Sequence, residues 1–263
     1  MKKSIVFALL LFFSSNLFAL NIAIMAADYA YYANDVKNKL ITTGMFGQVD
    51  LYQINLVTPT LAEMQNYDAI LVYSNAPIAN ASVFGDTLAD YVDGGGGVVT
   101  ALFATSSTHI TGRFNQDDYW AIEPSSNAHL TRGFLGTIFE PAHPIMAGVN
   151  SFDGGSQSYR PAIGDLHPNA TRIANWSLGS APLIATRVIH GVRRVDLGFF
   201  PPSSDALNVF WESDTDGDII LANSLKWVAN GSTAVPLSNS NKALLALLFA
   251  FASFFMMQHR RVA

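Results

Sequence analysis

Three polar side chains in the sequence carry the functional groups of acid–base catalysis. His109 follows an apolar run and a short Thr/Ser stretch, and Asp205 and Glu212 lie in a later segment rich in Pro and Ser. A histidine and a carboxylate within reach of a substrate could transfer protons in a hydrolase, including one that acts on carbohydrate. A loop residue exposed to solvent is the other interpretation, and we favour it for His109.

Nucleophilic catalysis has little support in the sequence. The chain contains no cysteine, which excludes a thiolate nucleophile and Cys-based metal sites. Ser106 and Ser107 follow the apolar run 98–102, but neither lies in the Gly-x-Ser-x-Gly pattern of a serine nucleophile. A serine hydrolase is therefore a minor alternative.

The string Asp214-Thr-Asp216-Gly-Asp218 presents alternating carboxylates, which are oxygen ligands of the kind that calcium prefers. A complete calcium loop of the EF-hand type has Glu at its twelfth position, where this chain has Leu225. We therefore favour a second interpretation, in which these aspartates cap the helix that follows.

The histidines offer no metal site of their own. They are dispersed along the chain and form no His-x-x-x-His pair that would place two ligands on one helix face. His143 precedes Pro144 and is typical of a structural turn. We expect no metal and no cofactor.

A larger set of aromatic and polar residues could line a ligand crevice. Aromatic rings can stack on a ligand, and Asp and Asn side chains can accept hydrogen bonds from its hydroxyl groups. Such a set suits carbohydrate or another neutral polar ligand, although Ser, Pro and Asp are also common in turns. The residues predicted to bind the ligand are Asp28, Tyr29, Ser74, Asn75, Phe103, His109, Ser204 and Asp205.

Apolar runs that alternate with helical patterns predict the elements that position these residues. The predicted strands of the first half are 20–26, 49–54, 69–73 and 98–102. The predicted helices are 30–43, one that starts at 58–63 with Thr60 and Glu63 in capping-box register, and 84–93. Most of these strands lack an alternating pattern, which indicates a parallel sheet covered on both faces. The fold class is therefore α/β, a doubly wound and mainly parallel sheet.

The second half is richer in Gly, Pro and Ser, and its elements are shorter. The predicted strands are 135–139, 171–176, 183–189 and 195–199, and a final helix covers 217–230. One domain over residues 20–231 accounts for all of these elements. Net charge is −5 and the domain has no Lys/Arg run, so we expect no nucleic-acid partner.

The two ends of the chain are hydrophobic and predict export. Residues 1–19 have two lysines, a short apolar stretch and a small residue, Ala19, as a signal peptide does, with the Sec machinery and signal peptidase as implied partners. An uncleaved anchor is the alternative. Residues 232–242 form a polar linker, 243–257 an apolar transmembrane helix and 258–263 a basic cytoplasmic tail.

The predicted transmembrane helix is short, because its apolar run would rise only about 22 Å. Arg260 and Arg261 follow it and place the C-terminus in the cytoplasm, so that the domain lies outside the inner membrane, in the periplasm. The order of Val235-Pro236-Leu237-Ser238, a short helix and a basic cluster resembles bacterial C-terminal sorting signals of the PEP-CTERM and IPTL-CTERM types. The resemblance implies a sorting protease and transfer to the cell surface. A plain tail anchor is the alternative.

Several strings of the domain resemble a known superfamily. They are Asp68-Ala-Ile-Leu-Val-Tyr, Leu88-Ala-Asp-Tyr-Val-Asp-Gly-Gly-Gly-Gly-Val-Val, His143-Pro-Ile-Met-Ala-Gly-Val, Arg194-Val-Asp-Leu-Gly-Phe-Phe and Asn223-Ser-Leu-Lys-Trp-Val. Their order along residues 20–230 resembles the class I glutamine amidotransferase-like superfamily and its ThuA-like members. The resemblance implies a flavodoxin-like sheet with a ligand crevice at the carboxyl ends of its strands. It also implies a nucleophilic Cys after strand 98–102, where this chain reads Ala101-Leu-Phe-Ala-Thr-Ser106.

A glutaminase of that superfamily needs the missing thiol, so amidotransferase activity is excluded. The sequence predicts a pseudoenzyme of the cell envelope: an exported, membrane- or surface-tethered domain that binds a ligand or partner without catalysis. A hydrolase that uses His109 and Asp205, or a structural envelope component, remains an alternative.

Overall fold

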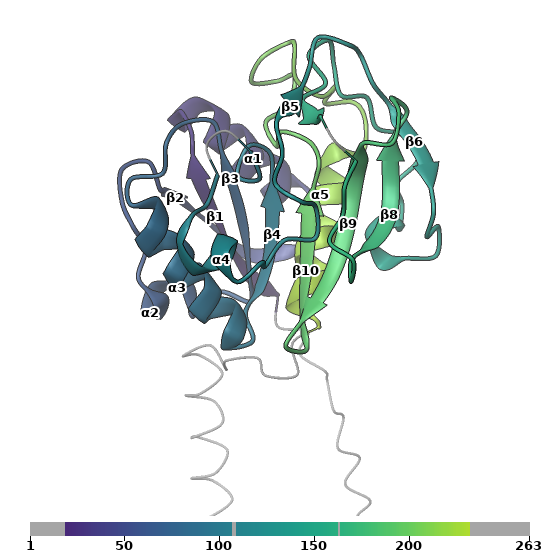
Figure 1. The fold of residues 1–263 in the computed structure, drawn as a ribbon. Coiled ribbons are helices and arrows are strands. Elements are labelled where there is room, and N and C mark those ends of the chain that lie inside the picture. The colour runs from purple at the N-terminus through teal and green to yellow at the C-terminus, as the bar shows by residue number, and fades with distance from the viewer. Residues whose placement is uncertain (1–18, 107–108, 163, 232–263) are drawn as a thin grey trace, which may run out of the picture.

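A sheet of eight strands runs through the domain (Figure 1). The structure is a computed structural model that describes residues 19–106, 109–162 and 164–231. The strand order is β2-β1-β3-β4-β10-β9-β8-β6. These strands are β1 Leu20–Ala27, β2 Phe46–Gln53, β3 Ala69–Ser74, β4 Gly97–Ala101, β6 Leu135–Ile138, β8 Thr171–Trp176, β9 Pro182–Ile189 and β10 Val192–Leu197. Two short strands, β5 Asn127–Ala128 and β7 Arg160–Pro161, form a separate small sheet.

Five α-helices accompany the strands in the described chain. They are α1 Ala30–Thr42, α2 Leu61–Met64, α3 Ala81–Asp93, α4 Gly112–Gln116 and α5 Gly217–Ala229, and a single 3-10 turn, η1, covers Pro144–Met146. The predicted capping box is confirmed: Thr60 Oγ1 accepts a hydrogen bond from Glu63 N at 3.3 Å, and Glu63 Oε2 accepts from Thr60 N at 2.8 Å. The helix that it starts is only one turn long.

The first half confirms the doubly wound prediction. β2, β1, β3, β4 and β10 pair in parallel. Neighbouring side chains on β1 face opposite cores: Ile22 and Ile24 pack in the cluster that includes α1 and α5, and Ala23 and Met25 pack in the cluster that includes α3. Both faces of the parallel strands are therefore covered, which explains why their sequences are apolar without alternation.

The second half adds antiparallel strands to the mainly parallel sheet, which is therefore mixed. Here each neighbouring pair of strands is antiparallel: β10 with β9, β9 with β8, and β8 with β6. A tight turn at His190 and Gly191 joins β9 to β10, and both residues have positive φ, 50° and 83°. Such a turn matches the twist of a two-residue hairpin. In the sequence, only Gly191 indicates this hairpin turn. The last strand was predicted to begin at Val195, three residues after its actual start at Val192.

Both described ends of the chain leave at the amino ends of the parallel strands, at the bottom of Figure 1. Leu20 begins β1 there. α5 runs back across the sheet and ends beside the start of β4, where a Cβ on Gly97 would lie 2.7 Å from the Val228 carbonyl carbon. Trp227 O also accepts a hydrogen bond from Arg193 Nη1 at 3.2 Å. The carboxyl ends of the strands lie at the opposite pole.

The predicted end segments lie outside the described residues. They are residues 1–18 of the signal peptide, the linker and sorting motif with Val235, Pro236, Leu237 and Ser238, the helix 243–257, and the tail with Arg260 and Arg261. Within the described ranges, no helix combines the length and the apolar character that crossing a bilayer requires.

Candidate functional site

The carboxyl ends of three parallel strands bring part of the predicted ligand set together. Asp28 follows β1, Ser74 ends β3 and is followed by Asn75, and Phe103 lies just after β4. Asn75 Nδ2 donates to Asp28 Oδ1 at 3.0 Å, and Phe103 N donates to Ser74 O at 2.8 Å. β1 and β3 are also the strands at which the order of the sheet reverses, the place where doubly wound folds bind ligands.

Asp28 is the buried acid of this site, with only 1% of its surface exposed. Its Oδ1 accepts hydrogen bonds from Tyr29 N at 2.8 Å and from Asn75. Its Oδ2 is buried and has no hydrogen-bond partner among the described residues. Burial raises the pKa of Asp28 to about 6, against the opposing effect of the two hydrogen bonds. The carboxyl group therefore changes charge in the mildly acidic range.

Tyr73 lies on β3 one residue before Ser74 and is fully buried. Its hydroxyl also lacks a hydrogen-bond partner within the described part of the chain. Burial raises the pKa of Tyr73 well above its ordinary value, and the nearby negative charges of Asp28 and Asp35 add to the shift. Two polar groups without a hydrogen-bond partner among the described residues therefore lie near the switch point.

Aromatic rings occupy the space above the strand ends. The aromatic cluster, as we call it, consists of Phe103, Tyr159, Phe200 and Phe210. The ring centroids of Phe103 and Phe200 lie 5.2 Å apart, those of Phe103 and Tyr159 5.1 Å, and those of Phe200 and Phe210 5.0 Å. These separations are typical of packed aromatic pairs.

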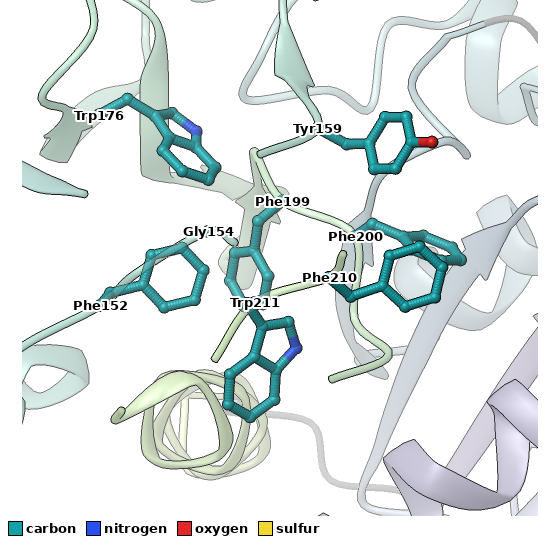
Figure 2. A pocket seen from close by; sticks show the side chains of 8 residues that line it. All are labelled: Phe152, Gly154, Tyr159, Trp176, Phe199, Phe200, Phe210 and Trp211. Atoms are coloured by element: carbon teal, nitrogen blue, oxygen red, sulfur yellow. The ribbon is translucent and has the colours of Figure 1, made fainter. Parts of the chain in front are cut away.

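A second group of rings continues the cluster deeper into the domain (Figure 2). Phe152, Trp176, Phe199 and Trp211 surround a space of only about 10 Å³ next to Phe200 and Phe210. That volume is close to the least that one water needs. Trp176 Nε1 donates to Gly198 O at 2.8 Å and Trp211 Nε1 to Pro201 O at 2.7 Å. The rings are thus fixed in place as core, and this part of the crevice is filled.

The segment after β4 forms a tight turn, and it does not present Ser106 as an exposed nucleophile. Phe103 stands in it and packs into the aromatic cluster. Ser106 Oγ donates to Phe103 O at 3.1 Å, and Ser106 itself is 9% exposed. Ser107 lies outside the described residues.

His109, Asp205 and Glu212 lie in three different surroundings. His109 Nδ1 is 2.9 Å from Ser106 O, and the side chain lines an open hollow with Asn115 and Ser125. Asp205 lies along α1 and forms an ion pair with Lys39 at 2.7 Å.

Glu212 forms an ion pair with Arg132 at 2.9 Å, and Arg132 also contacts Asp153. Asp205 and Glu212 therefore pair with different cations, and their side chains and that of His109 do not converge on one point. Ser204 Oγ accepts a hydrogen bond from Ser213 N at 2.9 Å, within the same loop as Asp205. Tyr29 is 72% exposed at the rim of the strand ends.

The aspartates before α5 do not all cap it as predicted. Asp216 occupies the N-cap position, but its side chain makes no capping hydrogen bond. Its Oδ2 instead accepts from Asn150 N at 2.7 Å and Ser151 N at 2.8 Å, so it fixes a neighbouring loop. Asp218 does accept from a helix amide, Ile219 N, at 2.8 Å. Among the described residues, Asp214, Asp216 and Asp218 belong to no group of three or more His, Cys, Asp or Glu side chains suited to a metal.

Two of the strings that suggested a superfamily have structural roles. His143 accepts a hydrogen bond from Ile145 N at 3.3 Å, and its ring lies 4.9 Å from that of Trp227, as expected of a structural turn. Arg194 and Asp196, both on β10, form a fully buried ion pair at 2.9 Å, and their side chains also form hydrogen bonds with backbone atoms of residues 119–122. Burial lowers the pKa of Arg194 to about 10, and the charge of Asp196 opposes that shift.

Sequence reasoning missed the partners of Phe103. Tyr159 and Phe210 come from long connections without regular periodicity, so nothing in the sequence placed them beside the strand ends. Tyr73 was assigned only to a strand. Its position directly before Ser74 and Asn75 could have indicated a site residue, because the hydroxyl of a tyrosine in a buried strand needs a hydrogen-bond partner.

Solved structures share this fold. The chain superposes on a ThuA-like protein from Bacteroides uniformis with a TM-score of 0.58 at 14% identity, over 82% of this chain and 94% of that one. For a ThuA-like protein from Parabacteroides merdae the TM-score is 0.55 at 12% identity, over 81% and 91%. For the cytoplasmic protein STM1381 from Salmonella typhimurium LT2 it is 0.52 at 13% identity, over 80% and 99%.

At these identities the likeness shows the fold alone. The domain therefore has the fold of ThuA-like proteins, which agrees with the glutamine amidotransferase-like architecture that the sequence strings implied. No protein-family model matches the sequence, and no curated protein matches it.

Proposed function

We propose that the chain is an exported domain of the bacterial envelope, tethered to the membrane or cell surface, that binds a ligand or partner and does not catalyse a reaction. The observation that carries the proposal is Phe103. It stands in the turn where glutaminases of this fold carry their nucleophile, and it packs against Tyr159 and Phe200. A packed aromatic ring at that position cannot act as a nucleophile.

The positions of the described chain ends support the tether. Gly231 follows α5 at the amino pole of the sheet, so a membrane helix after it would approach the domain from that pole. The strand ends, with Asp28 and Asn75, would then point away from the membrane.

Export and the tether are tested by fractionation. Cells that produce the chain are separated into cytoplasmic, periplasmic, membrane and surface fractions, and mass spectrometry identifies the mature termini. We expect an N-terminus at Leu20 and membrane association that depends on residues 232–263. A chain that stays in the cytoplasm with Met1 intact would overturn this part of the proposal, and a C-terminus near Ser238 would identify a sorting protease as a partner.

The filled crevice is tested by Phe103→Ala. Because the ring is partly buried and packs against the core, we expect the substitution to lower the free energy of unfolding by about 2–3 kcal/mol, less than for a fully buried Phe, in urea unfolding. The control is Tyr29→Ala, which removes an exposed ring beside the same strand ends. Unchanged or increased stability of the Phe103→Ala variant would instead indicate an open, ligand-ready crevice.

A structural envelope component is the second candidate, and the filled aromatic cluster favours it as well. The two candidates differ in whether the surface of the domain has to carry a ligand-binding cleft. A structural component needs no cleft for a ligand, whereas a binding domain does.

A further inference from the structure

A polar groove runs along the exposed side of α1, apart from the strand ends. One wall is α1 itself, and the other is the segment between β10 and α5. Its volume is about 680 Å³, within the range of small-molecule sites. We call it the α1 groove, and its residues are Tyr31, Asn34, Asp35, Asn38, Lys39, Thr42, Asp205, Ala206, Ser213 and Asp218.

An aromatic ring is exposed at one end of the α1 groove. Tyr31 is 64% exposed, although its hydroxyl donates to Asp205 O at 3.2 Å. Its ring packs at 5.9 Å from that of Tyr32. The ring is therefore held in place with a free surface, as a stacking platform for an apolar sugar face requires.

Most charges in the groove are already committed within the protein. Asp35 Oδ2 accepts from Ser203 N at 2.7 Å, and its Oδ1 accepts from Ser203 Oγ at 3.2 Å. Asp205 accepts from Lys39 Nζ and from Ser213 Oγ, both at 2.7 Å. These two contacts hold the pKa of Asp205 below its usual value. The side chains of the two aspartates and Lys39 are thus held by contacts within the protein, so they define the walls of the groove and are not free to pair with a charged ligand.

The uncommitted polar atoms of the groove are mostly neutral. Asn38 is exposed, and its carboxamide has no hydrogen bond among the described residues. Asn34 uses only its Nδ2, which donates to Ala30 O at 2.7 Å, so its Oδ1 is available. Asp218 uses Oδ1 for Ile219 N and presents one further oxygen. Asn34 and Asn38 are four residues apart and lie on the same face of α1.

The charge and chemistry of the groove select one class of ligand. Three carboxylates against one lysine repel phosphates and other anions. An apolar ligand would strip water from the amides without replacing their hydrogen bonds. A ligand with many hydroxyl groups can donate to the oxygens of Asn34 and Asp218, accept from Asn38, and place its apolar face on Tyr31.

We propose that the α1 groove binds a neutral oligosaccharide, with Tyr31 as the stacking platform and Asn38 as the central hydrogen-bonding residue. This proposal deepens the binding role proposed above and rests on it.

The test is isothermal titration of the full chain, purified in lauryldimethylamine oxide because that detergent carries no sugar. The probes are cellohexaose, maltohexaose and chitohexaose. We expect at least one to bind, and we expect the Kd to rise at least tenfold in both Tyr31→Ala and Asn38→Ala. Ile41→Ala is the matched control, since Ile41 is also exposed on α1 but lies outside the groove.

Failure of all three probes to bind would overturn the proposal, and so would binding that survives both substitutions. Binding lost equally in Ile41→Ala would also contradict it, because the loss would then not depend on the residues of the groove. None of these outcomes affects the export and tethering proposed above, which fractionation tests separately.

Discussion

Asp28 shows how the fold handles a carboxyl group at the switch point. The carboxyl is buried, one oxygen receives two hydrogen bonds, and the other oxygen has none from the described residues. Burial outweighs the two hydrogen bonds, so the protonated form is favoured up to about pH 6. In the unfolded chain the same group loses its proton near its ordinary pKa of 3.8.

This difference predicts a pH-dependent effect of Asp28→Asn. Between about pH 4 and 6 the folded protein retains a proton that the unfolded chain has lost, so the contribution of Asp28 to stability falls as pH rises through that window. Asn cannot ionise and keeps an oxygen for the two donors. We expect the variant to be more stable than the wild type by about 2–3 kcal/mol at pH 8 and nearly equal to it at pH 4.

Urea unfolding at both pH values measures this effect. Asp214→Asn, at an exposed position, serves as the control and should show no comparable change. A stability gain that is larger at pH 4 than at pH 8 would contradict the assignment of a raised pKa to Asp28.

The polar residues of the strand ends were predictable for a simple reason. Residues that follow parallel strands must gather at one edge of the sheet, so Asp28, Ser74, Asn75 and Phe103 came together from strand assignment alone. His109 and Asp205 depend on the direction of long loops, which no periodicity encodes, and the structure places them elsewhere. The filling of the crevice depends on Tyr159 and Phe210, whose positions are also set by loops.

At the scale of elements, the close approach of α5 to β4 fixes how the last helix lies on the sheet. Gly97 begins β4 and has no side chain where α5 crosses it. A Cβ at this position would lie 2.7 Å from both the carbonyl carbon and the oxygen of Val228. Backbone atoms cannot move aside as a flexible side chain can, so the helix or the strand would have to shift.

We therefore expect Gly97→Ala to destabilise the domain by about 1–3 kcal/mol, as overpacking does. Thermal unfolding followed by circular dichroism measures the loss. Gly94→Ala is the matched control, because its Cβ would meet only backbone oxygens of its own helical turn, the nearer being Asp90 O at 3.2 Å. Equal losses at the two positions would mean that the packing of α5 is not responsible.

Elements of the first half were predicted to within a few residues, because a short apolar run between two helical patterns forms a buried strand in α/β folds. The antiparallel arrangement of β8, β9 and β10 was not predicted. Parallel and antiparallel strands differ in how they are connected, and only the short turn at His190 and Gly191 carries that information. The brief helix α4 has too few residues to show a helical period.

At the scale of the whole molecule, the end of α5 and the carboxyl ends of the parallel strands lie at opposite poles of the sheet (Figure 1). The length of the parallel strands separates the poles by roughly 20 Å. The chain contains no cysteine, so single cysteines can report on each pole without interference. Asn75→Cys marks the carboxyl pole, and His190→Cys marks the amino pole, where the histidine side chain is 69% exposed.

Each variant is labelled with a maleimide fluorophore and reconstituted into liposomes whose lipid head groups carry a quencher. If the tail anchors the domain from the amino pole, the fluorophore at position 190 should be quenched more strongly than the one at position 75. Equal quenching, or stronger quenching at position 75, would contradict the proposed orientation. Unlabelled liposomes give the reference intensity for both.

The place of β10 in the sheet also bears on when the domain can fold. β10 joins the parallel half of the sheet to the antiparallel half. Arg194 on β10 pairs with Val98 on β4, although most of the second half of the domain separates them in sequence. A ribosome therefore releases β1, β3 and β4 long before the strand that completes them. Pairings so distant in sequence form slowly. We expect a nascent chain with this topology to stay unfolded until late in its synthesis, which would suit the export proposed above, because a chain passes through a narrow channel only before it folds.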